Sequence, residues 1–328
     1  MKSGARTIVG HRASLIGEVP EIIDQRNLTL FRGKRGEWFR IFETGGPDRL
    51  SIQGQLLQAI VDDLTYRVFT QESSQNKDGE GLAIPSLRYL LNVGYVTSQA
   101  LLSRRLLDSR KDVSSIKRIV KDLRKHRRLI TRENFVSFDG TPYTYNLSSE
   151  NESSIEFKLW GLQAPGFSDQ LRSYHRHERF DELSKVPPTN RTRNDLIDSR
   201  ILHTIEMWLE SPEANHLKDI SDSRFAHATD GSHSQFRGDL SAITLHEVEK
   251  AQRGFVMSTR AIFDVVLNSE NHSEVVPHLP LGSFGRVWSG EQVIDSTRRM
   301  QEHWDELVNQ RNSWGVQVDD ELYQQAFA

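Results

Sequence analysis

Residues 51–70 read SIQGQLLQAIVDDLTYRVFT and give the clearest sign of the architecture. Apolar side chains recur here every three or four residues, at Ile52, Leu56, Leu57, Ile60, Val61 and Leu64. This period gathers them on one face of an α-helix, which has to be buried against other elements. We therefore predict a core helix over residues 51–70.

The same period returns in five further stretches. Pro85 suits the first turn of a helix that runs to about Leu107. Thr244 and Glu247 form a capping box, in which each side chain bonds to the other residue's backbone N–H. The remaining predicted helices cover residues 113–123, with Asp112 and Ser114 as candidate caps, 196–209 and 287–314. An all-α protein is the prediction.

The periodicity also divides the chain. Residues 1–47 mix Gly and Arg with short apolar runs and show no sustained period, so we predict an irregular N-terminal segment. Residues 48–270 are predicted to form a helical bundle, with an insertion over about 134–187 where the chain turns polar. Residues 271–328 are predicted to be a C-terminal helical extension.

Composition limits the classes of function. The formal net charge of -3 excludes a chain-wide attraction to nucleic acid, so only a local basic patch would bind it. Cysteine is absent, which excludes disulfides, zinc thiolate sites and cysteine nucleophiles. The first residues lack the apolar core of a signal peptide, and no apolar run reaches the roughly 18 residues of a membrane span. We expect a cytoplasmic protein without membrane contact.

One motif carries recognisable chemistry. Residues 217–230 read LKDISDSRFAHATD, in which Ala226 and Ala228 flank His227 and leave the backbone open to close approach. The half from Phe225 to Asp230, together with the capped helix after Thr244, resembles the HEPN family in its abortive-infection branch. That family carries an Arg, four to six residues and a His at the start of a helix. Residues 101–108, 303–307 and 311–314 are similar to the family's helical frame.

The resemblance implies an HEPN-like helical bundle that needs no cofactor and forms a homodimer with the motifs at its interface. It also implies metal-independent RNA cleavage, with His227 as the acid or base and Arg224 as a phosphate contact. Asp222 or Asp230 would orient the histidine. Ser221 stands six residues before His227, where the family's arginine is expected. A structural histidine that caps a helix or bonds to a carbonyl is the alternative for His227.

Other histidines form weaker patterns. An Arg followed by four residues and a His occurs at Arg6/His11, Arg172/His177 and Arg298/His303. About three such pairs are expected by chance, so we interpret them as coincidences. The run Tyr174-His-Arg-His-Glu178 is interpreted as a charged helix surface, because its arginines would oppose a metal cation. No metal site is predicted.

A basic tract covers residues 104–128. It holds eleven Lys and Arg residues against three Asp residues, a local charge of 11 − 3 = +8. Such a density suits RNA phosphates, and the predicted contacts are Arg118, Lys121, Arg124, Lys125, Arg127 and Arg128. The alternative is the solvated face of an amphipathic helix, since Ile116, Val120 and Leu123 already mark a buried face.

These patterns favour an HEPN-type protein of bacterial phage defence or toxin systems that acts on RNA, as a metal-independent endoribonuclease. One alternative is a non-catalytic HEPN module that binds a nucleotide, RNA or a partner protein, which Ser221 favours. A purely structural helical scaffold is the other. The expected partners are a second copy of the chain, RNA and an antidote protein.

Overall fold

The computed structural model describes residues 24–43, 51–75, 85–143, 167–223, 243–269, 293–316 and 318–328. All elements within these ranges are helices, and the one extended contact there is an isolated bridge between Thr131 and Leu196. The all-α prediction is confirmed. Within the same ranges, no helix combines the length and the apolar character that crossing a membrane requires.

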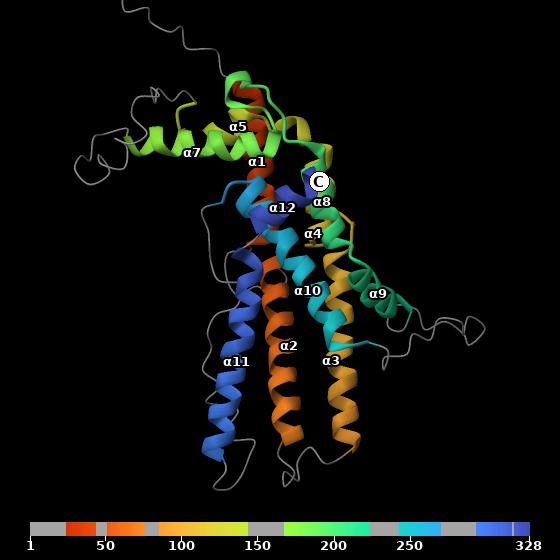
Figure 1. Cartoon of the computed structure of the whole chain (residues 1–328). Helices are drawn as coiled ribbons and strands as arrows, with labels where there is room; N and C mark the ends of the chain where they lie inside the picture. Colours follow the sequence, from red (N-terminus) through yellow and green to blue (C-terminus); the bar gives the residue numbers. More distant parts are fainter. Residues whose placement is uncertain are drawn as a thin grey trace, which may run out of the picture.

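Three long helices run side by side and form one end of the molecule (Figure 1). They are α2 (Ile52–Gln75), α3 (Pro85–Leu106) and α11 (Val293–Val316), and α10 (Leu245–Arg260) packs across all three. Ile60 and Leu64 of α2 meet Trp304 of α11 in the apolar contact between these helices. The helices predicted from residues 51, 85, 244 and 287 onwards are therefore present.

Six shorter helices gather at the other end of the molecule (Figure 1). They are α1 (Gln25–Phe42), α4 (Ile116–Lys125), α5 (Arg132–Ser137), α7 (Phe167–Ser184), α8 (Ser199–Leu209) and α12 (Val318–Phe327). The 3₁₀ turns Arg127–Leu129 and Pro188–Asn190 follow α4 and α7, and a π-helical turn, Ala261–Val266, continues α10. α9 (Pro212–Ser221) packs along α3.

Of the helix caps predicted from the sequence, the one before α10 is present, whereas the cap of α4 is a different residue from those predicted. Thr244 and Glu247 form the predicted capping box: the Glu247 amide donates to Thr244 Oγ1 at 3.1 Å and the Thr244 amide donates to Glu247 Oε2 at 2.8 Å. The cap of α4 is Ser115, whose Oγ accepts from the Arg118 amide at 3.1 Å. The predicted caps Asp112 and Ser114 lie before it, because the helix begins only at Ile116.

Two segments predicted to lie outside the bundle contribute to its core. Helix α1 falls within residues 1–47, and its Phe31 and Trp38 are fully buried. Arg35 stands between Phe31 and Trp38 on the apolar face and interrupts its period, whereas Gly33 and Gly36 are exposed. Helix α12 falls within the predicted C-terminal extension, and its Leu322 is fully buried in the same apolar cluster. Tertiary burial, rather than a strong local pattern, holds both helices.

The predicted insertion, residues 134–187, includes the end of α5 and helix α7. Buried arginines join this region to the bundle: Arg132 donates to Asp181 at 2.7 Å and to Asp195 at 2.8 Å. Within α7, Arg176 and His177 are buried, so the prediction of a charged helix surface at residues 174–178 is wrong for these two side chains. The contact between Arg132 and Asp181 joins α7 to the start of α5.

His177 makes the stability of this region depend on pH. Burial lowers the pKa of His177 below its ordinary value of 6.5, and the nearby Arg132 and Arg193 lower it further, although a hydrogen bond to the Tyr143 carbonyl opposes the shift. The folded ring therefore binds a proton less readily than the unfolded one. Stability is full above pH 6.5 and falls as the pH drops through that value.

We expect the free energy of unfolding to decrease between pH 7 and about pH 5, and the His177→Gln variant to lose this dependence. Urea unfolding at several pH values measures it. The His175→Gln variant is the matched control, since the side chain of His175 is 63% exposed on the same helix. An equal pH dependence in the His177→Gln variant would contradict the assignment.

A buried aspartate joins four helices. Asp63 of α2 is fully buried and contacts two arginines: Arg67 Nε at 2.9 Å and Arg311 Nη2 of α11 at 3.0 Å. The hydroxyl of Tyr95 from α3 donates to Asp63 at 2.6 Å. Glu249 of α10 lies 3.3 Å from Arg67 and 3.5 Å from Arg311. Two carboxylates and two guanidinium groups thus balance in charge inside the bundle.

Helices α8 and α10 approach each other so closely that only glycine fits at the contact. A Cβ atom added to Gly254 would lie 2.3 Å from the carbonyl oxygen of Trp208. One turn along α10, Ser258 Oγ donates to the Ile205 carbonyl at 3.0 Å. Backbone of one helix therefore packs directly against backbone of the other.

Candidate nucleic-acid interface

Helix α4, at the centre of the predicted basic tract, has four distinct faces. The first is apolar: Ile116, Ile119, Val120 and Leu123 are all buried in the core. These positions follow the helical period and fix how the helix is rotated. Its charged side chains consequently point in three other directions, and each direction meets a different neighbour.

The second face turns toward α8. Lys117 pairs with Glu210 at 3.0 Å, and Arg124, two turns later, pairs with Glu206 at 2.5 Å. Glu206 belongs to α8, within the predicted helix at residues 196–209, and Glu210 is the residue that caps the C-terminus of α8. Two of the eleven positive charges of the tract are thus matched by acidic side chains within the protein.

The third face turns toward α1. Arg118 lies 3.8 Å from Glu37 and donates to the Val113 carbonyl at 3.2 Å. Asp122 accepts hydrogen bonds from Trp38 Nε1 at 2.9 Å and Lys34 Nζ at 3.1 Å. Burial by itself raises the pKa of Asp122, but these two hydrogen bonds outweigh it and hold the pKa below its ordinary value. This face fastens α1 to the bundle.

The fourth face points into solvent. Lys121 and Lys125 are exposed one helical turn apart, and Arg128 is exposed in the 3₁₀ turn that follows. Among the residues that the structure describes, none of these three has an anionic partner. One turn separates side chains by about 6 Å along the axis. We call Lys121, Lys125 and Arg128 the basic face.

The six predicted RNA contacts therefore separate into two groups. Three form the basic face. Arg118 and Arg124 are paired with Glu37 and Glu206, and Arg127 donates to the Ile197 carbonyl at 2.9 Å. The local charge of the tract overstated the free positive charge, because the partner carboxylates lie far away in the sequence.

The predicted catalytic motif lies mostly outside the described residues, and Arg224, His227 and Asp230 are among those not described. Asp222 lies just after α9, where Arg104 Nε of α3 approaches its carboxylate to 2.7 Å and Lys218 Nζ approaches to 2.9 Å. Ser221, at the position of the family's arginine, is fully buried. Asp222 therefore connects the end of α9 to the first arginine of the basic tract.

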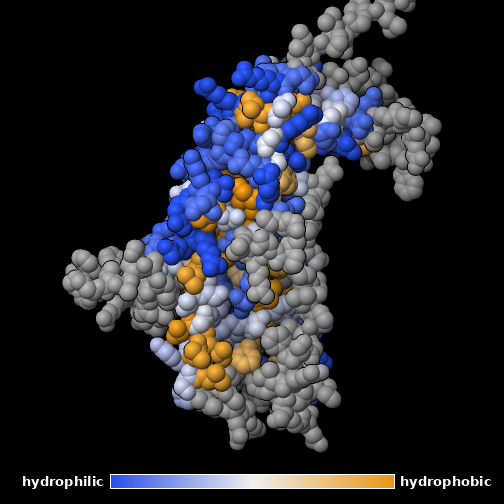
Figure 2. All heavy atoms as spheres, turned by 180° about the vertical axis from the view of Figure 1, so that it is seen from behind, coloured by the Kyte–Doolittle hydropathy of each residue, from blue (hydrophilic) through white to orange (hydrophobic). Residues whose placement is uncertain are grey.

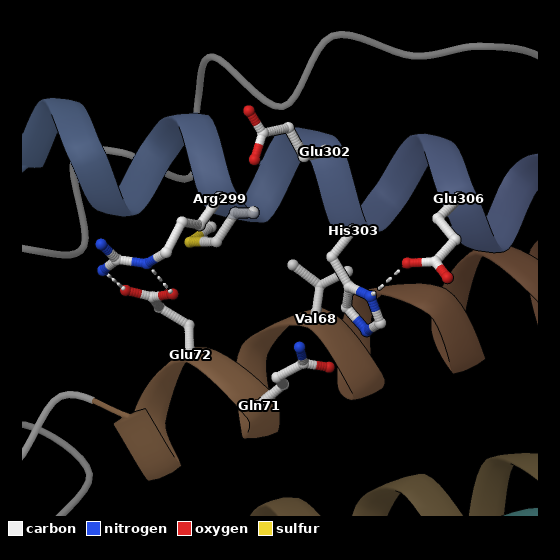
Figure 3. Close-up of a pocket in the computed structure, with 8 residues that line it drawn as sticks. Val68, Gln71, Glu72, Arg299, Glu302, His303 and Glu306 are labelled. Carbon is white, nitrogen blue, oxygen red and sulfur yellow. Dashed lines mark hydrogen bonds and ion pairs between the residues drawn. The ribbon is translucent and has the colours of Figure 1, made fainter.

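A small cavity brings an arginine and a histidine together on α11, where it packs against α2 (Figure 3). Its volume is about 250 Å³, and Arg299 and His303 line it. Arg299 donates to Glu72 at 2.6 Å, and His303 lies 3.7 Å from Glu306. Hydrogen bonds from Arg299 and Ser296 outweigh burial and lower the pKa of Glu72.

Arg298 and His303 have the spacing of an Arg, four residues and a His, which we interpret from the sequence as a coincidence. The side chain of Arg298 is 63% exposed and pairs with Glu302 at 3.1 Å. Arg299, four residues before His303, is the arginine that shares the cavity, and that spacing on an amphipathic helix was the signal for it. Since Glu72 already occupies this guanidinium and carboxylates surround the rim, the cavity offers little to a phosphate.

Metal ligation receives no support from the described part of the chain, where no three His, Asp or Glu side chains converge as ligands would. His175 and Glu178 approach each other at 3.4 Å on α7, whereas His177 points inward to Tyr143.

Comparison with known proteins adds no relative: no family model, no curated protein and no solved structure matches this chain.

Proposed function

We propose that the protein binds RNA through the basic face of α4 and its following turn. The observation that supports this is the selective exposure of Lys121, Lys125 and Arg128 among neighbours whose charges are matched internally. Exposed cations without partners are available to phosphates, and they release counterions from a phosphate backbone on binding.

The HEPN-type role in phage defence, with a second copy and an antidote protein as partners, remains a proposal that rests on the motif resemblance alone. RNA binding at the basic face is compatible with either a ribonuclease or a non-catalytic module. Arg104 gives the two regions a physical connection, because it belongs to the basic tract and contacts Asp222 at the edge of the motif.

We expect binding to a labelled single-stranded RNA to weaken with salt, with a slope of log K against log salt of about −2 for three phosphate contacts. A Lys121→Gln/Lys125→Gln/Arg128→Gln variant should bind at least about tenfold more weakly at low salt and show a slope near zero. Fluorescence anisotropy between about 50 and 200 mM salt measures both quantities.

The matched control removes the same three charges elsewhere, in an Arg88→Gln/Lys185→Gln/Arg298→Gln variant. Arg88 lies on α3, Arg298 lies on α11 and Lys185 directly follows α7, so none of them belongs to α4 or the turn after it. An equal loss of affinity in both variants would show that RNA binding depends only on the net charge of the protein, and it would contradict binding at the basic face. A salt response that stays flat in the wild type would remove the proposal altogether.

Cleavage is tested in the same preparations. Wild type and a His227→Ala variant are incubated with labelled tRNA and total RNA in EDTA, which excludes contaminating metal-dependent nucleases. Equal background cleavage by both proteins would exclude the ribonuclease and leave RNA binding as the function. Cleavage that is lost in the His227→Ala variant would assign the proton transfer to His227.

A further inference from the structure

A second and larger cavity lies between α2 and α3, away from the basic face. Its volume is about 430 Å³. Its walls come from positions three or four residues apart on both helices: Asp62, Thr65, Tyr66 and Phe69 on α2, and Leu90, Leu91, Gly94, Tyr95 and Ser98 on α3. The cavity is open beside Gly94, where an added Cβ atom would meet nothing within 4 Å.

The lower part of this cavity is apolar and open to solvent. Leu90 is 65% exposed and Leu87, one turn earlier, is 38% exposed. Figure 2 shows hydrophobic side chains gathered at this end of the molecule, where α3 begins. Single exposed apolar residues are ordinary, but apolar residues that line a cavity and continue to its rim mark a binding surface.

The upper part is polar, and its charge is unbalanced. Asp62 accepts hydrogen bonds from Gln58 Nε2 at 2.7 Å and from Ser98 Oγ at 3.2 Å, and both donors are neutral. Within the described ranges Asp62 forms no ion pair. The next residue, Asp63, contacts two arginines on the interior side. Of two successive aspartates, Asp63 pairs with arginines in the core, and Asp62 lines the cavity with neutral hydrogen-bond donors.

We propose that this cavity binds a small organic cation with an aromatic or alkyl body, an arylalkylamine in chemical class. Its ammonium group donates to Asp62, and its body lies against Phe69, Leu90 and Leu91. Cavities for small ligands are mostly apolar, hold a few polar groups and have volumes of roughly 300 to 1,000 Å³, a range that includes this one. The single carboxylate selects a cation over a neutral or anionic ligand of the same shape.

The inference is independent of RNA binding, since none of the lining residues belongs to the basic face. The probe is tryptamine, with indole-3-propionate as its anionic counterpart, and binding is followed by ligand-observed NMR and calorimetry on the full chain. We expect tryptamine to bind and indole-3-propionate to bind at least about tenfold more weakly, because a charge-assisted hydrogen bond is replaced by repulsion.

Two variants locate the site. Gly94→Leu fills the cavity and should abolish tryptamine binding, and Asp62→Asn should weaken it about tenfold or more. Gly36→Leu is the matched control, because Gly36 on α1 also has open space around its added Cβ atom. Retained binding in Gly94→Leu, equal binding of the two probes, or an equal effect of Gly36→Leu would overturn the proposal.

Sedimentation at the protein concentrations of the binding experiment tests the competing occupant. A dimer that Gly94→Leu converts to a monomer would overturn the small-ligand proposal in favour of a contact between two copies of the chain. A monomer that binds tryptamine through Asp62 supports it.

Discussion

Replacing Asp63 with alanine is expected to lower the free energy of unfolding by about 3–5 kcal/mol, because the change leaves a buried, unpaired charge. Arg311 is fully buried and would lose its contact with Asp63 Oδ2. Only Glu249 would remain to balance Arg311 and Arg67, at 3.5 and 3.3 Å. Tyr95, whose pKa burial and Asp63 raise well above its usual range, would lose its acceptor as well.

Urea unfolding followed by circular dichroism gives the difference, and Asp62→Ala provides the control. Asp62 is the preceding residue on the same helix but forms no ion pair among the described residues, so we expect its replacement to cost less than about 1 kcal/mol. A double-mutant cycle between Asp63→Ala and Arg311→Ala should show strong coupling. Similar losses for Asp62→Ala and Asp63→Ala would show that the buried network does not hold the helices together.

Replacing Gly254 with alanine is expected to destabilise the protein by about 2–3 kcal/mol, although alanine is the better helix former. The new methyl group would lie 2.3 Å from the Trp208 carbonyl oxygen, which belongs to the backbone of α8, and the methyl group itself would be fixed to the backbone of α10. Helices α8 and α10 would have to separate, which also weakens the hydrogen bond from Ser258 to the Ile205 carbonyl.

The same substitution at Gly36 is the control and should have the opposite sign. Gly36 lies within α1 with nothing near its added Cβ atom, so alanine there is expected to stabilise the protein by about 0.5–1 kcal/mol. Each variant adds one methyl group to a helical glycine, and the two positions differ in the space around that group. A neutral or stabilising Gly254→Ala would show that the two helices move apart without cost.

The helices were predictable where apolar residues repeat along the chain. Residues 51–70, the helix after Pro85 and the Thr244–Glu247 capping box all depend on neighbours within a few positions, and all are present. Helix α1 was not predictable, because Arg35 interrupts its apolar stripe and Trp38 is buried by residues far away in the sequence. In the predicted helices the local apolar pattern matches the buried face, whereas in α1 it does not.

The sequence predicted the stretch of chain that carries the candidate interface, but not which of its side chains are free to bind RNA. The density of Lys and Arg over residues 104–128 identified the tract, and the apolar period correctly gave α4 a buried face. Which cations remain free depended on Glu37, Glu206 and Glu210, which lie on other helices. The cavity between α2 and α3 left no comparable signal, since its leucines follow the same period as core residues.

The sequence by itself determined that the chain is helical, where its main helices begin and which stretch carries positive charge, because these properties arise from residues close together in the chain. The tertiary structure alone decided which charges are cancelled, which aspartate is buried and which apolar residues stay exposed. Those outcomes depend on contacts between residues as far apart as Asp63 and Arg311, and no local pattern encodes the distance between two such side chains.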